Sequence, residues 1–273
     1  MKKESRKLSP LSRGGRGAGR GGCNPEAKPE PRKARLWLFD LDNTLHDASH
    51  AAFGPISAAM TGYIVEHLGI DEAAATELRQ LYWRRYGATL LGMVRHHPVK
   101  ADHFLEQTHR LPGLEEHLRT SAPDRAALRR LRGKKVVLTN APRRYAERVL
   151  AALGLAKSFD ALLGIEDMAM FGQLRPKPDR RMLARVAARL GVPPTRCILV
   201  EDTLEHQKAA HSLGMRSVWM QRYLGGRFRG PSYDPKIAPS ARRGNAEVGV
   251  HHGPKPLYVY ARIKSLKELH RIR

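Results

Sequence analysis

Short apolar runs that end in polar residues recur along the chain, and the stretches between them carry a helical period. The first run, residues 36–40, reads Leu-Trp-Leu-Phe-Asp. Strands of a parallel sheet that are buried on both faces read as continuous apolar runs of this kind. The run therefore predicts a central parallel strand. Strands are expected at 35–40, 135–139, 159–163, 197–201, 216–220 and 257–263.

Amphipathic stretches separate most of these strands. Helices are expected at 143–153, 179–190 and 204–213, with a short one from Ser265. Strands that alternate with helices predict an α/β fold with a doubly wound, Rossmann-like parallel sheet. Between the first two strands the pattern is helical throughout, which predicts an inserted all-helical segment. Its helices are expected at 55–68, 71–86, 100–110 and 124–131.

Polar side chains follow three of the strands. Asp40 and Asp42 end the first, Thr139 ends the second, and Glu201-Asp202 end the 197–201 strand. Open α/β sheets bind ligands at the carboxyl ends of their strands, so we expect these groups to meet. Carboxylates that crowd together repel each other unless a cation lies between them. Mg²⁺, which prefers oxygen ligands, meets that need.

These groups and Lys177 supply what a phosphoryl-transfer site needs: a carboxylate nucleophile, a metal, a hydroxyl and a cation. Each also has a purely structural interpretation. Thr139 and Asn140 suit the cap of the helix that follows. Lys177 precedes a proline typical of turns, and Glu201-Asp202 suits a helix N-terminus.

Taken in order, the motifs resemble the haloacid dehalogenase (HAD) superfamily of phosphohydrolases. They are Asp40-x-Asp42-x-Thr44, Thr139, Lys177 and Glu201-Asp202, and the resemblance covers roughly residues 34 to 225. Within that superfamily the chain is most similar to the pyrimidine 5′-nucleotidase-like branch. The phrases that carry this finer resemblance are Phe-Asp-Leu-Asp-Asn-Thr-Leu at 39–45, Tyr-Gly-Ala-Thr-Leu-Leu-Gly-Met at 86–93, Leu-Thr-Asn-Ala at 138–141 and Arg-Pro-Lys-Pro at 175–178.

The resemblance implies roles for the first motif. Asp40 is expected to attack phosphorus and form an aspartyl-phosphate, which splits one difficult displacement into two steps. Asp42 is expected to act as general acid and then as general base. Both aspartates are also expected at the Mg²⁺ ion, Asp42 through its backbone carbonyl.

The later motifs have implied roles as well. Thr139, Asn140 and Lys177 are expected to bind the phosphoryl group, and Asp202 and Glu201 to bind or surround the metal. In this branch an Asn often stands four residues after the second acid of the last motif, where this chain has His206. With an imidazole at this position, the resemblance does not predict which groups surround the metal ligands.

The same resemblance divides the chain into domains. A HAD-type core is expected at 34–46 and 132–273, with a helical cap domain at 47–131 that closes over the substrate. Tyr86, His96 and His97 are candidates for substrate specificity in the cap. Alternatively, Tyr82, Trp83 and Tyr86 form a helix face that packs inside the cap.

The expected reaction is Mg²⁺-dependent hydrolysis of pyrimidine nucleoside 5′-monophosphates such as UMP or CMP. The first alternative is a phosphatase or phosphomutase for another small phosphate, such as phosphoglycolate or a sugar phosphate. A different class of protein, RNA-binding or regulatory, is suggested by charge. The 273 residues carry a net charge of +23, and residues 1–33 hold ten basic and three acidic residues.

Residues 1–33 contain an Arg-Gly run, and their composition predicts a disordered basic tail. Residues 222–255, rich in Gly, Pro and Arg, are expected to form a loop inserted in the core. Cys23 and Cys197 are unsuited to a shared disulfide, which indicates a reducing compartment. No run of about 18 uncharged apolar residues is present. A cytoplasmic protein that acts on a small metabolite without membrane contact is therefore expected.

Overall fold

The computed structural model describes residues 35–224 and 255–272 of the chain. Strand β1 (Leu36–Phe39) is buried along its whole length and lies between two parallel neighbours, as its apolar run predicts. The prediction of a disordered tail at 1–33 lies outside the described residues. Most of the loop expected at 222–255 lies outside them too.

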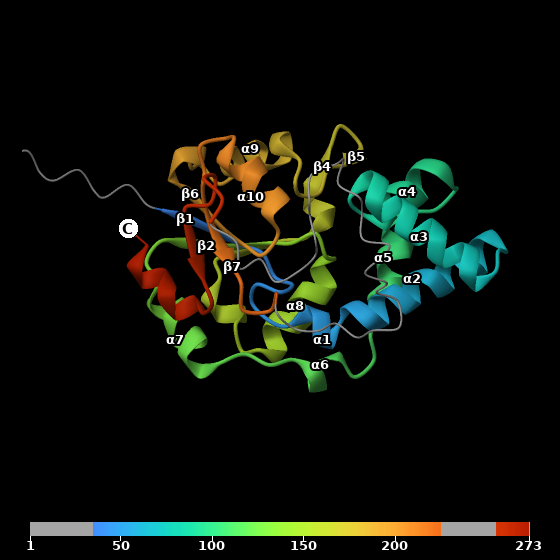
Figure 1. The fold of residues 1–273 in the computed structure, drawn as a ribbon, viewed down its shortest axis with the longest axis horizontal. Helices are drawn as coiled ribbons and strands as arrows, with labels where there is room; N and C mark the ends of the chain where they lie inside the picture. Colours follow the sequence, from blue (N-terminus) through green and yellow to red (C-terminus); the bar gives the residue numbers. More distant parts are fainter. Residues whose placement is uncertain (1–34, 225–254, 273) are drawn as a thin grey trace, which may run out of the picture. The chain divides into compact units, whose positions relative to one another are not determined.

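Six strands form one sheet in the order β3-β2-β1-β6-β7-β8, and every pairing is parallel (Figure 1). The other five strands are β2 (Lys134–Leu138), β3 (Ala161–Leu163), β6 (Cys197–Glu201), β7 (Arg216–Met220) and β8 (Ala261–Ile263). The chain winds outward from β1 to β3, then returns beside β1 and winds the other way. In open α/β sheets, ligands bind at such a reversal, which lies here at the carboxyl ends of β1 and β6. The predicted doubly wound α/β fold is confirmed.

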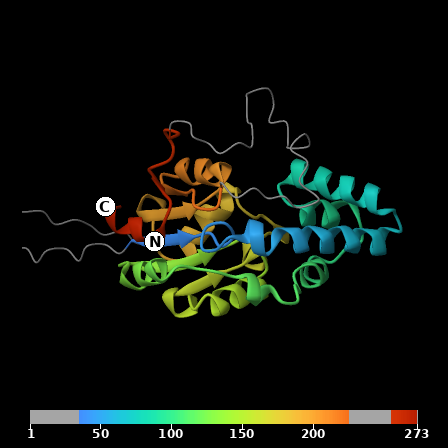
Figure 2. The ribbon, with the colours of Figure 1, turned by 60° about the horizontal axis from the view of Figure 1, so that its bottom comes forward.

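Side chains alternate along β1 and build two cores. Trp37 and Phe39 face one hydrophobic cluster, which includes residues of α7 (Ala122–Arg130) and α8 (Arg143–Ala152). Leu36 and Leu38 face the other. That second cluster includes residues of α9 (Arg180–Arg189) and α10 (Leu204–His211). Helices therefore cover both faces of the sheet, as Figures 1 and 2 show.

The segment between β1 and β2 is helical, as predicted. It contains α1 (Ala48–Ala51), α2 (Phe53–Leu68), α3 (Glu72–Tyr86), α4 (Thr89–His96), α5 (Ala101–Thr108), α6 (Leu114–His117) and α7. Helices α2 to α5 share a hydrophobic cluster that also takes in Ile165 from beyond β3. The exact division into a core and a cap at 47–131 stays a prediction.

Several elements differ from the sequence prediction. Helix α4 was not expected, because it is short, contains Gly92 and begins without a side-chain cap. Burial of Leu90 and Met93 against its neighbours stabilises it. The hairpin of β4 (Ala169–Met170) and β5 (Gln173–Leu174) was not expected either, since strands of two residues leave no periodic pattern.

The C-terminal end is less regular than predicted. The strand expected at 257–263 is reduced to β8, and Leu257 is fully exposed. The helix expected from Ser265 is a 3-10 helix, η5 (Leu266–Arg271), whose first turn is capped by the Ser265 hydroxyl. None of the helices in the described ranges is long and apolar enough to cross a membrane.

Candidate active site

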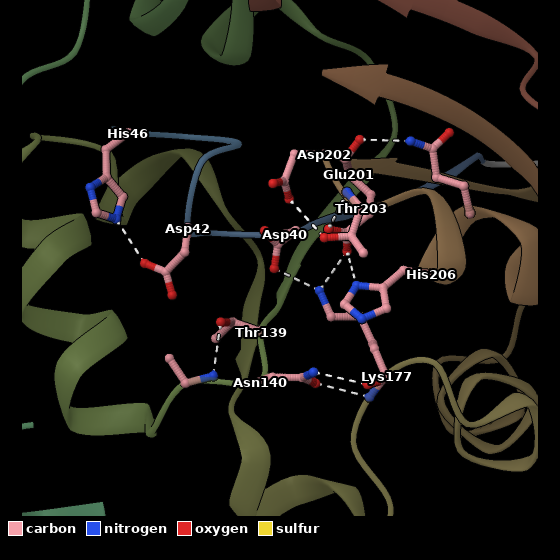
Figure 3. Close-up of polar contacts among 12 residues, drawn as sticks. Asp40, Asp42, His46, Thr139, Asn140, Lys177, Glu201, Asp202, Thr203 and His206 are labelled. Atoms are coloured by element: carbon pink, nitrogen blue, oxygen red, sulfur yellow. Dashed lines mark hydrogen bonds and ion pairs between the residues drawn. The ribbon is translucent and has the colours of Figure 1, made fainter. Parts of the chain in front are cut away.

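Lys177 joins the ends of β1 and β6. Its Nζ donates to Asp40 Oδ1 at 2.6 Å and to Glu201 Oε2 at 2.7 Å, as Figure 3 shows. Asp40 directly follows β1 and its backbone N–H bonds to Val200 of β6, so the two strand ends are locked side by side. Lys177 is only 2% exposed. A buried ammonium between two carboxylates forms strong charge-assisted hydrogen bonds.

Asn140 fixes the backbone that carries Lys177. Its Oδ1 accepts from the Lys177 N–H at 2.9 Å, and its Nδ2 donates to the Lys177 carbonyl at 3.0 Å. Asn140 follows β2, whereas Lys177 lies in the loop between β5 and α9. The amide therefore holds the lysine loop against the strand ends.

Thr139, one residue past β2, is buried. In Figure 3 its side chain lies next to Asn140. Its Oγ1 accepts from the Ala141 N–H at 3.1 Å. That bond uses the oxygen as an acceptor and leaves the hydroxyl hydrogen free to donate.

Asp40, Glu201 and Asp202 form an acidic cluster. Each has a carboxylate oxygen within 4.8 Å of the others. Burial raises the pKa of Asp40 to about 7, and the charge of Glu201 adds to the rise while Lys177 opposes it. Burial and the charges of Glu201 and Asp40 hold the pKa of Asp202 well above its ordinary value.

In Glu201 and Lys177, which pair directly, the charge of the partner outweighs the effect of burial on the pKa. Burial by itself would raise the pKa of Glu201, but Lys177 and then His206 outweigh it and the pKa lies below its ordinary value. Burial would lower the pKa of Lys177, but Asp40 and Glu201 hold it above its ordinary value. The lysine is therefore a permanent cation, whereas Asp40 and Asp202 lack a full counter-charge.

The cluster fits a hard divalent cation. All its donors are carboxylate oxygens, which Mg²⁺ prefers. Lys177 uses Asp40 Oδ1 and leaves Oδ2 without a hydrogen bond inside the described residues. Glu201 is more fully occupied, since Oε2 accepts from Lys177 and Oε1 accepts from the Thr203 N–H at 3.2 Å. Asp40 and Asp202 are the better-placed ligands.

Asp42 follows the same end of β1, but Figure 3 shows its carboxylate turned away from Lys177 and toward His46. Its Oδ1 accepts from His46 Nε2 at 3.0 Å and from the Tyr145 hydroxyl at 2.8 Å. Asp42 is not part of the acidic cluster. Its expected place at a metal through the backbone carbonyl stays a prediction.

His206, which stands where relatives often have Asn, lies beside Glu201. His206 Nδ1 lies 3.0 Å from Glu201 Oε2, an ion-pair distance without the alignment of a hydrogen bond. The next residue, Gln207, donates from Nε2 to the Glu201 carbonyl at 2.9 Å. Helix α10 therefore supports Glu201 from two successive residues.

The three candidate specificity residues lie on or beside α3 and α4 and bond within that pair of helices. The Tyr86 hydroxyl bonds to His96 Nε2 at 2.5 Å, and the Tyr82 hydroxyl bonds to His97 Nε2 at 2.7 Å. Tyr82 is buried, whereas Trp83 is half exposed. No hydrogen bond joins these side chains to the strand-end residues in the described part of the chain. Their role in specificity stays a prediction.

Two residues of this neighbourhood were missed from the sequence. His46 stands four positions after Asp42, and this spacing is the one signal that pointed to it. Tyr145 reaches Asp42 from α8, 103 residues away, and no local pattern marks it.

The fold defines a doubly wound α/β protein whose strand-end carboxylates lie at a topological switch point. The profile of the haloacid dehalogenase-like hydrolases matches residues 34–214, about two thirds of the sequence, and the chain belongs to this family. The predicted superfamily and the prediction of an enzyme are thereby confirmed.

Two curated proteins illustrate the range of relatives. Phosphate metabolism protein 8 of Saccharomyces cerevisiae is 24% identical over 209 residues, which are 71% of this chain and 64% of that protein. The chain thus spans less than two thirds of this relative's length. Hexitol phosphatase B of Escherichia coli K12 is 28% identical over 204 residues, which are 69% of this chain and 84% of that protein.

A solved structure agrees on the fold. The HAD phosphatase from Thermococcus onnurineus superposes with a TM-score of 0.51 at 21% identity and covers 87% of this chain and 97% of its own. The prediction of a phosphoric monoester hydrolase is confirmed at the level of the family and of its phosphatase relatives. The pyrimidine nucleotidase branch is not confirmed by these relatives.

Proposed function

We propose that the protein is a Mg²⁺-dependent phosphatase that acts on a small phosphorylated metabolite, of the sugar phosphate or phosphoglycolate class, through an aspartyl-phosphate. The observation that supports it most is the bridge from Lys177 to Asp40 and Glu201 beside Asp202. It combines a carboxylate with one free oxygen, a fixed cation and spare carboxylate ligands.

In the first step, a carboxylate oxygen of Asp40 forms a bond to phosphorus while the bond from phosphorus to the leaving oxygen breaks. Asp42 gives its proton to that oxygen, so that an alcohol departs instead of an alkoxide. Lys177 holds Asp40 in place and offsets charge on the phosphoryl oxygens. Thr139 donates its free hydroxyl hydrogen to one of them.

In the second step, Asp42 takes a proton from a water whose oxygen bonds to phosphorus. The Asp40–phosphorus bond breaks, which releases inorganic phosphate and restores the carboxylate. Asp40, Asp202 and the Asp42 carbonyl would hold Mg²⁺, with Glu201 beside them. When bound, the ion supplies positive charge between the acidic cluster and the phosphate.

The substrate class follows from the relatives and from the helical segment. Hexitol phosphatase B is named for a sugar alcohol phosphate, which favours a small substrate over a nucleotide. The candidate specificity residues already form hydrogen bonds within the helical segment, Tyr86 with His96 and His97 with Tyr82. Both observations favour the alternative over hydrolysis of UMP or CMP.

Steady-state phosphate release from a panel of monoesters tests this proposal. The panel contains a hexitol phosphate, fructose 1-phosphate, phosphoglycolate, UMP and CMP, each with Mg²⁺ and with EDTA. We expect kcat/KM for the best sugar phosphate or phosphoglycolate to exceed that for UMP and CMP at least about tenfold, a difference of 1.4 kcal/mol in transition-state binding. Activity should be lost in EDTA.

Two outcomes would redirect the proposal. UMP or CMP as the best substrate would restore the nucleotidase interpretation. Conversion of a hexose 1-phosphate to its 6-phosphate without phosphate release would indicate a phosphomutase. The variant Asp40→Asn, which retains the shape of the side chain but lacks a nucleophilic carboxylate, should show no turnover of any ester.

A further inference from the structure

We infer that Tyr145 and His46 are positioning residues for Asp42 and direct its proton to the leaving oxygen. This inference rests on the proposed function, because it assigns a structural support to the general acid of that reaction. Both residues donate to the same oxygen, Asp42 Oδ1, at 2.8 and 3.0 Å.

The chain turn after β1 places His46. The Leu45 N–H bonds to the Leu41 carbonyl at 2.8 Å and Asn43 has a positive φ of 57°, so the chain makes a tight, non-helical turn. A backbone bridge joins Asp42 to His46 across this turn, which places the two residues beside each other. The imidazole is thus fixed by the same loop that carries the carboxylate.

The surroundings of His46 indicate that the bond to Asp42 is its main polar contact. The side chain is 0% exposed, and its Nδ1 has no hydrogen-bond partner among the described residues. An unpaired buried nitrogen costs free energy. A hydrogen on Nε2 supplies the donor that the Asp42 carboxylate accepts.

Tyr145 is fixed from the opposite side. It belongs to the hydrophobic cluster between the sheet and α8, and the His109 ring contacts it edge-on at 5.7 Å. On the same helix, Arg148 donates to the Leu111 carbonyl and to Glu115, which anchors the segment after α5 that carries His109. The hydroxyl of Tyr145 therefore has little freedom to leave Asp42.

Two donors on one oxygen have a chemical consequence. They fix the plane of the carboxyl group and occupy Oδ1, so Oδ2 is left to carry and return the transferred proton. Misplacement of a group by about 1 Å can cost about 10²-fold in rate. Loss of either donor should therefore weaken proton delivery without affecting the nucleophile.

Leaving-group dependence separates this role from a general effect on folding. The alkoxide of a hexitol phosphate needs a proton to depart, whereas p-nitrophenolate is stable without one. We compare kcat/KM for the two esters, because this constant reports the steps up to departure of the leaving group. Tyr145→Phe should lower kcat/KM for the alkyl ester about 10- to 100-fold, a partial loss of the roughly 10²- to 10⁴-fold that general-acid catalysis contributes. It should lower the value for p-nitrophenyl phosphate less than about threefold.

Matched variants complete the experiment. Tyr63→Phe removes the hydroxyl of another buried tyrosine, one bonded to His103 at 2.9 Å, and should leave the ratio of the two constants unchanged. His46→Ala should reproduce the selective loss. His46→Gln, whose amide can still donate, should recover part of it. Urea unfolding of each variant confirms that it is folded.

The outcomes distinguish the two proposals. If the wild-type protein hydrolyses both esters and Tyr145→Phe slows both equally or neither, the positioning role is overturned while the proposed function stands. If the wild-type protein hydrolyses neither ester, the proposed function fails and the positioning role falls with it.

Discussion

At the residue scale, Lys177 supplies the positive charge that partly neutralises the acidic cluster. One ammonium serves Asp40 and Glu201, and Asp202 adds a third carboxylate within reach of both. One cation does not neutralise three clustered acids, so protons or a metal must supply the rest. Burial, and then the charge of Glu201, raises the pKa of Asp40, whereas Lys177 and His206 outweigh burial at Glu201 and lower its pKa.

The raised pKa of Asp40 predicts a pH-dependent stability in EDTA. Its value of about 7 exceeds the ordinary 3.8, so the folded state binds the proton more tightly than the unfolded state. The resulting stabilisation is complete below about pH 4 and is lost as pH rises toward and through 7. We expect the unfolding free energy of the wild type to fall relative to that of Asp40→Asn between pH 5 and pH 7. Above pH 7 the difference should level off.

Urea unfolding at pH 5, 6, 7 and 8 measures this difference. Asp40→Asn is the reference because it cannot titrate at this position. Addition of Mg²⁺ at pH 8 should restore stability to wild type and not to the variant, since the ion replaces the missing proton. A difference that is constant across this pH range would contradict the prediction.

At the element scale, helices α3 and α4 show how packing replaces local sequence signals. Helix α4 lacks a capping side chain and contains Gly92, which disfavours a helix. The glycine faces the ring of Tyr82 on α3 so closely that no side chain fits between them. A feature that weakens the helix by itself is thus what allows the two helices to pack.

Gly92→Ala is therefore expected to destabilise the protein by about 1–3 kcal/mol, the usual cost of overpacking. The added methyl group must displace Tyr82 and disturb its bond to His97. The control is Gly62→Ala in α2, where an added methyl group meets nothing within 4 Å. That change should stabilise the helix by about 0.5–1 kcal/mol. Urea unfolding of both variants measures the contrast, and equal effects would refute this account of α4.

At the scale of the whole molecule, Asp124 in the first turn of α7 connects this helix to the C-terminal part of the chain. This buried carboxylate accepts from the Ser265 hydroxyl at 2.6 Å and from the Lys267 N–H at 3.3 Å. It also pairs with Arg222 beyond β7. One side chain therefore joins α7 to segments about 100 and 140 positions later, including the start of η5.

Asp124→Ala should destabilise the protein by about 2–4 kcal/mol, because the Ser265 hydroxyl and the Lys267 N–H lose their acceptor and the partly exposed Arg222 loses its ion-pair partner. Asp71→Ala is the matched control. Asp71 is an exposed N-terminal cap that accepts from the Ala74 N–H at 2.8 Å, and its loss should cost about 1 kcal/mol. Urea unfolding compares the two variants. If Asp124→Ala lowers the unfolding free energy no more than Asp71→Ala does, the contacts of Asp124 contribute little to stability.

The sequence by itself determined the strands of the six-stranded sheet, their parallel class, and the acids and lysine that meet at their ends. Continuous apolar runs mark buried parallel strands, and polar groups that follow them can gather at one edge only. What the tertiary structure decided is which atoms meet. Lys177 reaches Asp40 across 137 residues, and Tyr145 reaches Asp42 across 103. Such contacts depend on strand order and on the packing of α8 against the sheet, and the local pattern around either residue does not encode them.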